Sequence, residues 1–379
     1  MSAQKFIKKK AKTGEKKLKP TKPVEAVVEK PEVKEEPVVP LGKMKICVIG
    51  AGAMGGLIAA CLKAKRRIIT LIGKPDQIRA IRSNGLKVEG VKNTVYVEID
   101  IKESMQEKAD LVILAVKIQD IKNVLDNNRS FLLNTPILTI QDGIRADKIV
   151  SLALGEENII SSIVMFGSTY LKPNLISYDF EGDWIIGKLL GENNDKVKEI
   201  AEEISPAFKV TITEDIASKK WMQLIVVATH CIPALLGKST QEAFSNLDMA
   251  QLAVLLLKEN FAVVNDAGIK LADLPNFDLN KLQQLTSLPV KDAAQAFSEI
   301  VISSSKQIKD ISIINKISMD YLLEMDHTNG EIIRLARFGR VGAQLNTKSV
   351  NLANKVKKIN TFLNYAEISK VFNQGLIAS

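Results

Sequence analysis

The sequence is poor in the residues that bind metals and form disulfide bonds. It has three cysteines and two histidines among 379 residues. The cysteines, Cys47, Cys61 and Cys231, lie far apart, so they form neither a metal-ligand spacing nor a disulfide framework. We therefore expect no metal site and a reducing compartment, the cytoplasm.

Long apolar runs are also missing. A stretch such as Leu252–Leu257 is far too short to span a membrane, and no apolar signal-peptide core is present. The chain carries no nucleophile-elbow or P-loop pattern. These absences exclude several hydrolase and nucleotidase classes and predict that no membrane is a partner.

The net charge of +9 is concentrated at the N-terminus. Residues 1–40 hold eleven lysines against six glutamates, and five of the twelve prolines. Such a segment cannot bury enough surface to offset its chain entropy, so residues 1–42 are predicted to be a disordered Lys/Pro-rich tail. Nucleic acid is an unlikely partner except through the basic cluster Lys8–Lys10 in this tail, for which a purely solvating role is the alternative.

From residue 43 the pattern predicts an α/β fold in two parts. Short β-rich runs alternate with helical ones, which is typical of a parallel sheet. Strands are expected at Lys45–Ile49, Arg67–Ile72, Asp110–Val116 and Ile137–Ile140, with a helix over 75–83. After about residue 213 only helical patterns follow, over 217–228, 249–267, 290–309 and 319–337. We expect a Rossmann-type domain over 43–212 and an all-helical domain over 213–379.

The most informative motif follows the first strand. The turn Gly50-Ala51-Gly52-Ala53-Met54-Gly55 stands between an apolar strand and an apolar helix. In a dinucleotide site, the first glycine allows the tight turn, the second admits the pyrophosphate, and the third lets the helix pack closely on the strand. The pyrophosphate then meets the N-terminus of the helix. The six residues are therefore candidate cofactor-binding residues.

The end of the second strand indicates which nucleotide binds. An NAD site would carry an acidic residue there to bind the ribose hydroxyls. This strand ends in Ile72-Gly73-Lys74, without an acid. A lysine suits a 2′-phosphate, so NADPH/NADP+ is the expected cofactor; a solvated loop lysine is the alternative.

Taken together, several segments resemble the ketopantoate reductase (2-dehydropantoate 2-reductase) family from Met44 to about Ile359. They are the glycine turn, Lys74 with 80–86, the strand ending Val116-Lys117, the turn Gln141-Asp142-Gly143, and a C-terminal block: Glu324-Met325-Asp326, Asn329-Gly330, the basic helix Arg334–Arg337 and Asn346-Thr347. Ser312 falls twelve residues before Glu324, where the family has a serine.

The resemblance implies NADPH-dependent reduction of a 2-oxoacid, ketopantoate to pantoate, a step of pantothenate and coenzyme A synthesis. In the family a lysine protonates the carbonyl oxygen, a glutamate holds the substrate hydroxyl and that lysine, and a serine binds the carboxylate. Glu324 and Ser312 match the glutamate and serine, and Lys117 matches a lysine near the nicotinamide. The family often forms homodimers, so a homodimer is possible.

Three positions depart from the family pattern. The helix that carries the family lysine reads Trp221-Met222-Gln223 here, with Val227 in place of a pocket asparagine. The turn asparagine is replaced by Asp142. Gln223 cannot donate a proton near neutral pH, and losing a positioned donor typically costs about 10²–10⁴-fold in rate.

Other groups are candidates for the missing donor. Asp142 and Glu324, if they face one cavity, should not both ionise easily, so one is expected to keep its proton near neutrality. Lys219 and Lys220 lie four and three residues before Gln223, and Lys117 could reach from the strand end.

The two histidines are weaker candidates. His230 lies seven residues after Gln223 on the same face, where it would either line a cleft or be a core residue, and His327 has no role in the family. Three functions stay open: a ketopantoate reductase, a reductase of the same fold for a less anionic ketone or imine, and a non-catalytic NADP(H)-binding protein.

Overall fold

The computed structural model describes residues 41–275, 277–304 and 311–373. Within these ranges, the side chains of residues 304, 311–313 and 373 are not described. The tail predicted over 1–42 lies almost entirely outside the described residues. The described residues belong to one compact unit. The division of this unit into domains at residue 212 stays a prediction.

An eight-stranded sheet lies in the first half of the described chain. Its order is β12-β11-β8-β7-β6-β1-β2-β5, and all neighbours are parallel except β8 and β11. The strands are β1 (Lys45–Ile49), β2 (Ile68–Ile72), β5 (Asp100–Lys102), β6 (Leu111–Leu114), β7 (Ile137–Thr139), β8 (Ile159–Val164), β11 (Asp183–Gly187) and β12 (Lys209–Ile212). Strand β6 has four buried residues, as expected for a central parallel strand.

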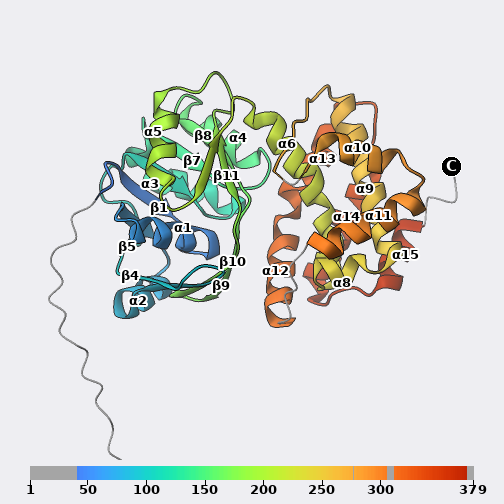
Figure 1. Ribbon diagram of the computed structural model, residues 1–379, viewed down its shortest axis with the longest axis horizontal. Helices are drawn as coiled ribbons and strands as arrows, with labels where there is room; N and C mark the ends of the chain where they lie inside the picture. The colour runs from blue at the N-terminus through green and yellow to red at the C-terminus, as the bar shows by residue number, and fades with distance from the viewer. Residues whose placement is uncertain (1–40, 276, 305–310, 374–379) are drawn as a thin grey trace, which may run out of the picture. The chain divides into compact units, whose positions relative to one another are not determined.

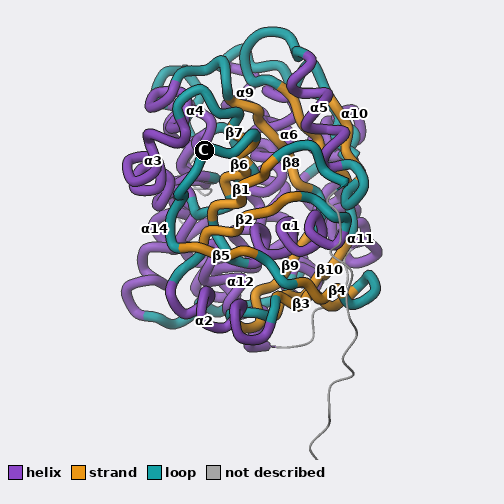
Figure 2. The backbone as a smooth tube through the Cα atoms, turned by 90° about the vertical axis from the view of Figure 1, so that its left-hand side faces the viewer, coloured by secondary structure: helices purple, strands orange, loops and turns teal. Residues whose placement is uncertain are grey.

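A second, four-stranded sheet was not expected from the sequence. It contains β3 (Leu86–Gly90), β4 (Val95–Val97), β9 (Gly167–Lys172) and β10 (Leu175–Phe180), in the order β4-β3-β10-β9. Helix α1 (Ala53–Ala64) packs against this sheet (Figure 2). The packing is close, because a Cβ at Gly56 would come within 2.2 Å of Ile176 Cδ1.

Helices cover both faces of the large sheet. Apolar residues of α1 and α5 (Asp195–Ile204) share one core cluster, and those of α3 (Ile118–Leu132) and α4 (Arg145–Leu154) share another. Helix α2 (Pro75–Asn84) follows β2. Because both faces are covered, the strand ends are the places where this sheet can meet a ligand.

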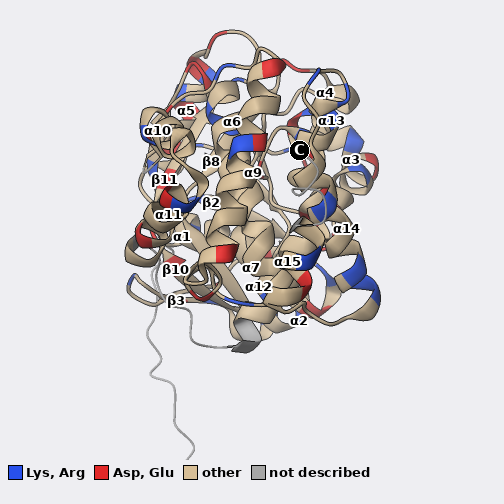
Figure 3. Ribbon diagram, turned by 90° about the vertical axis from the view of Figure 1, so that its right-hand side faces the viewer, with Lys and Arg blue, Asp and Glu red and all other residues tan. Residues whose placement is uncertain are grey.

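From Ile216 onward the described elements are helices (Figure 1). They are α6 (Ile216–Val227), η1 (Ala228–His230), α7 (Cys231–Leu236), α8 (Thr240–Phe244), α9 (Leu247–Asp266), α10 (Leu279–Ser287), α11 (Val290–Ser304), α12 (Ile311–Glu324), η2 (Met325–His327), α13 (Asn329–Ala336), α14 (Gln344–Ile359) and α15 (Tyr365–Asn373). The side shown in Figure 3 carries basic and acidic residues interspersed. In the described ranges, none of these helices combines the length and apolar character that a membrane crossing requires.

The expected fold class is confirmed: a sheet dominated by parallel strands is followed by a helical region. The single helix predicted over 319–337 is wrong, however. The chain leaves the helix after Glu324 and restarts at Asn329, with Thr328 at φ −109° and ψ −86°. Buried side-chain hydrogen bonds fix the break, since Asn329 Nδ2 donates to the carbonyl of Ala228 and to Asn346 Oδ1. The periodicity of apolar residues, from which the helix was predicted, carries no information on such tertiary hydrogen bonds.

Candidate active site

The glycine turn has the geometry that a dinucleotide site needs. Gly50 follows β1 with φ +114°, which strongly favours glycine, and its backbone lies against the carbonyl of Ala115 after β6. A Cβ at Gly55 would fall 1.9 Å from the carbonyl oxygen of Gly50. These two glycines therefore allow the tight turn and the close approach of α1 to it.

The space at Gly52 is the part of the turn that is open to a ligand. A Cβ at Gly52 would meet no described atom within 4 Å, and its φ is an ordinary −79°. Gly52 caps helix α1, whose first N–H groups have no partners within the helix. The N-terminus of a helix attracts phosphate through these groups and its dipole. Gly50–Gly55 thus fit the pyrophosphate of a dinucleotide.

Gln77 joins this turn to the end of β2. It is buried on α2, where its Oε1 accepts from the backbone N–H of Lys74 at 2.9 Å and its Nε2 donates to the carbonyl of Ala51 at 2.7 Å. The side chain of Lys74 is exposed beside this junction. The predicted cation for a 2′-phosphate is therefore held next to the glycine turn, by a residue that the sequence analysis missed.

Two polar segments follow β6 and β7 at the same edge. Gln141 Nε2 donates to the carbonyls of Leu114 and Val116, both at 2.8 Å, and so holds the two strand ends together. Lys117 leads into α3, and its Nζ lies 2.6 Å from Oδ1 of Asp320 on α12. Gly143, with φ +68°, turns the chain after Asp142.

Gln223 and Asp142 are in direct contact. Gln223 Nε2 on α6 donates to Asp142 Oδ1 at 2.8 Å, while Gln223 Oε1 is buried without a hydrogen-bond partner among the described residues. The loss of hydration beside α6 raises the pKa of Asp142, against the opposing effects of Lys220 and the Gln223 hydrogen bond. Where the family presents a cationic donor, this chain presents an amide bound to a carboxyl group.

Lys220 and Lys219 are both engaged elsewhere. Lys220 has no exposed side-chain surface, and its Nζ pairs with Asp147 Oδ2 at 2.6 Å. Asp147 Oδ1 also accepts from the Thr139 hydroxyl. Lys219 Nζ donates to the backbone carbonyl of Asp273. These contacts do not favour either lysine as a proton donor to a ligand.

Glu324, which lies near these strand ends, has an altered acidity. It is the last residue of α12 and is half-buried. Loss of hydration raises its pKa from 4.5 to about 7; Lys117 opposes this rise, while Asp142, Asp320 and Asp120 add to it. Glu324 is thus partly protonated at neutral pH and can both hold and release a proton.

Helix α12 contacts the sheet region at a second point. Lys316 Nζ donates to the carbonyl of Tyr170 on β9 at 2.7 Å and lies 4.7 Å from the centre of that ring. Lys316, Asp320 and Glu324 follow one another at intervals of four residues, on one face of the helix. Ser312 precedes them by four more on α12, but its side chain lies outside the described residues.

The histidines lie at the margins of this region. His230 is exposed rather than part of a core, with its ring centre 6.4 Å from that of Tyr321. The backbone carbonyl of His327 would lie 3.7 Å from a Cβ at Gly143, and in the described chain its own Nδ1 is buried without a hydrogen-bond partner. A search of the described residues finds no three His, Cys, Asp or Glu residues grouped to hold a metal ion.

The C-terminal block serves the packing of the helices. Asn346 Nδ2 donates to Glu259 Oε1 and Asn260 Oδ1 on α9, and its Oδ1 accepts from Asn329. Asn329, Asn346 and Asn260 have no exposed surface. Because buried amides need partners, this network fixes α9, α13 and α14 together and thereby holds the segment that ends α12.

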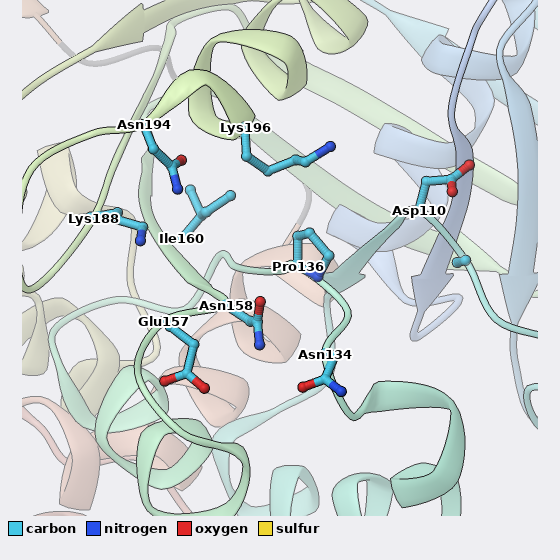
Figure 4. Close-up of a pocket in the computed structure, with 10 residues that line it drawn as sticks. Asp110, Asn134, Pro136, Glu157, Asn158, Ile160, Lys188, Asn194 and Lys196 are labelled. Atoms are coloured by element: carbon cyan, nitrogen blue, oxygen red, sulfur yellow. The ribbon is translucent and has the colours of Figure 1, made fainter.

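A polar hollow lies at the opposite edge of the sheet. It has a volume of about 420 Å³ and is lined by residues before β6, β7 and β8, including Asp110, Asn134 and Asn158, and by Lys188 and Lys196 (Figure 4). Ligands of open α/β sheets bind beyond the carboxyl ends of the strands, whereas this hollow lies at their amino ends. It is therefore separate from the candidate site.

The chain is similar in sequence to known proteins. Residues 46–191 match the family model described as ketopantoate reductase PanE/ApbA. A relative from Pyrococcus horikoshii, named 2-dehydropantoate 2-reductase, is 28% identical over 80% of this chain and 94% of its own length. A relative with the same name from Archaeoglobus fulgidus is 21% identical over 83% of this chain and 98% of its own length.

Solved structures share the fold. The 2-dehydropantoate 2-reductase from Geobacter metallireducens superposes with a TM-score of 0.69 at 19% identity, covering 82% of this chain and 99% of its own. A D-mandelate dehydrogenase solved with NADH gives a TM-score of 0.68 at 18% identity, covering 84% of this chain and all of its own.

Fold and comparisons together define the class, which is that of the nicotinamide-nucleotide-dependent oxidoreductases. Within that class, the chain resembles the ketopantoate reductase family in sequence and has its fold.

Proposed function

We propose that this protein catalyses the NADPH-dependent reduction of a small carbonyl compound, with ketopantoate as the leading substrate and pantoate as its product. The observation that carries the proposal is the position of Glu324. Lys117 and Asp142 both act on the pKa of Glu324. These two residues follow β6 and β7, at the edge of the sheet where the glycine turn follows β1. The names of the relatives support the choice of ketopantoate.

The residues of the chain have distinct roles in this proposal. Gly50–Gly55 and α1 would hold the pyrophosphate and Lys74 would bind the 2′-phosphate. By the family resemblance, Lys117 would lie near the nicotinamide. Bound NADPH supplies a hydride to the carbonyl carbon. Glu324, with a pKa of about 7, donates its proton to the carbonyl oxygen and takes the place of the missing lysine. Ser312 is the proposed partner of the substrate carboxylate.

One observation favours a second substrate class. Gln223 Oε1 is buried and accepts no hydrogen bond from the described residues. A buried acceptor without a partner is costly, and a substrate with an N–H or O–H group would satisfy it. A less anionic ketone or imine is therefore the alternative substrate for the same site.

NADPH oxidation by the purified protein, with and without ketopantoate, tests the proposal. Turnover well above the blank supports it. Tight NADPH binding without turnover of ketopantoate or of the neutral ketones and imines would contradict catalysis and favour a non-catalytic NADP(H)-binding protein.

A further inference from the structure

The ion pair between Lys117 and Asp320 includes the cation that lowers the pKa of the proposed proton donor, Glu324. Lys117 Nζ lies 2.6 Å from Asp320 Oδ1, and Lys117 is the cation that acts on the pKa of Glu324. The lysine and aspartate side chains are 37% and 52% exposed. Since solvent reaches both partners, an incoming ligand can compete for the pair.

Three other described cations are already paired with acidic residues. Lys220 is buried against Asp147, and Arg145 and Arg334 both lie close to the buried carboxylate of Glu331. The carboxyl groups of Asp142, Asp320 and Asp120 all raise the pKa of Glu324. An anionic substrate therefore approaches a group of three aspartates and one lysine around Glu324, and that lysine, Lys117, is itself paired with Asp320.

The position of Asp320 is fixed by its helix. Lys316, one turn earlier on α12, is anchored to the carbonyl and ring of Tyr170, and Glu324 follows one turn later. Asp320 thus pairs with Lys117 on a helix face that Lys316 anchors one turn earlier. Its carboxylate neutralises Lys117, the cation acting on Glu324 that could otherwise pair with the negative charge of a 2-oxoacid.

We infer that Asp320 is a positioning residue that sets substrate specificity: by occupying Lys117, it disfavours 2-oxoacid anions relative to uncharged carbonyl compounds of the same shape. This inference rests on the proposed reductase function and favours the second of its two substrate classes, the less anionic carbonyl compounds. A 2-oxoacid anion must displace Asp320 or leave its own charge unpaired. An uncharged 2-oxo ester needs neither to displace Asp320 nor to find a partner for a charge.

The test compares a 2-oxoacid with its methyl ester as substrates for wild type and Asp320→Asn. The ratio of kcat/KM for acid over ester should rise about tenfold in the variant, through a lower KM for the acid, because Lys117 is freed for a charge-assisted hydrogen bond. Asp320→Glu should keep the wild-type ratio. An unchanged ratio in Asp320→Asn would overturn the inference.

Two control variants separate the charge of Asp320 from other effects. Asp120→Asn removes another carboxylate that acts on Glu324 but does not pair with Lys117, and Lys316→Met removes the anchor at Tyr170. Both should leave the ratio within about twofold. An equal rise in either would show that bulk charge or helix docking, rather than Asp320, sets specificity.

The pH profile gives a supporting measure. Asp320 raises the pKa of Glu324 and Lys117 lowers it, and Asp142 and Asp120 still raise it in the variant. In Asp320→Asn the alkaline limb of kcat/KM for the ester should therefore move to lower pH. No turnover of either substrate by wild type would overturn the proposed function and this inference with it, whereas turnover with an unchanged acid-to-ester ratio in Asp320→Asn would overturn the inference alone.

Discussion

Gln223 Nε2 donates a hydrogen bond to Asp142 Oδ1 at 2.8 Å, and this contact joins helix α6 to the turn after β7. Both residues stand where the sequence departs from the family pattern. An amide and a carboxyl group in contact are a matched pair, because the amide donates and the carboxyl accepts. The two departures therefore form one local arrangement.

Replacing Gln223 tests what that arrangement does. In Gln223→Lys, the new ammonium would pair with Asp142 and supply a cationic donor, so turnover of a 2-oxoacid should rise by about 10²-fold. Gln223→Met, which removes the contact without adding a donor, is the matched control. Steady-state NADPH oxidation measures both. A folded Gln223→Lys protein with no gain would show that this site does not hold a latent ketopantoate reductase.

The glycine turn offers a pair of substitutions with opposite expected effects. Gly52→Ala adds a Cβ that meets no described atom, so stability should be unchanged while NADPH affinity falls on the order of tenfold. Gly55→Ala puts a Cβ 1.9 Å from the Gly50 carbonyl, so it should destabilise the fold. Thermal unfolding and NADPH fluorescence titration distinguish them. Undiminished NADPH binding by Gly52→Ala would place the pyrophosphate elsewhere.

Lys74 should decide between the two nicotinamide nucleotides. Lys74→Ala is expected to weaken NADPH binding about tenfold and to leave NADH binding unchanged, because only NADPH carries the 2′-phosphate. Arg79→Ala on the exposed part of α2 is a control for the loss of a nearby positive charge. Equal losses for both nucleotides in Lys74→Ala would argue against a 2′-phosphate contact.

The parts of the fold and site that depend on local sequence could be predicted. The turn Gly50–Gly55 and the polar residues after β6 and β7 were found because strand, turn and helix signals adjoin there. The small sheet was missed because its short strands pair across distant segments, such as Leu86–Gly90 with Leu175–Phe180. Local periodicity does not encode that pairing.

The contacts that arrange the site were harder to predict for the same reason. Lys117 and Asp320 are 203 positions apart, and the sequence of neither segment indicates which residue its side chain contacts. The spacing of four between Asp320 and Glu324 was the available signal, since it puts both on one helix face. For Lys220, the sequence suggested a surface group or a substitute donor, and only the fold shows its burial against Asp147.

The buried pair makes a prediction about stability. Lys220→Met leaves Asp147 buried without its counter-ion and should lower the free energy of unfolding by about 3–5 kcal/mol. Adding Asp147→Asn should restore a large part of the loss, because the charge that lacked a partner is then removed. Urea unfolding of both variants measures this. A small effect of Lys220→Met would show that the Asp147 carboxylate finds another partner.

The pH dependence of turnover in wild type and Glu324→Gln tests the central claim most directly. Glu324 donates only in its protonated form, so with a pKa of about 7 the wild-type rate should be highest in acid and fall as pH rises through that value. Glu324→Gln should lose about 10²–10⁴-fold in kcat and the pH limb with it, while Asp326→Asn, the next carboxylate along the chain, keeps both. A Glu324→Gln enzyme with the wild-type rate and pH limb would contradict Glu324 as the proton donor.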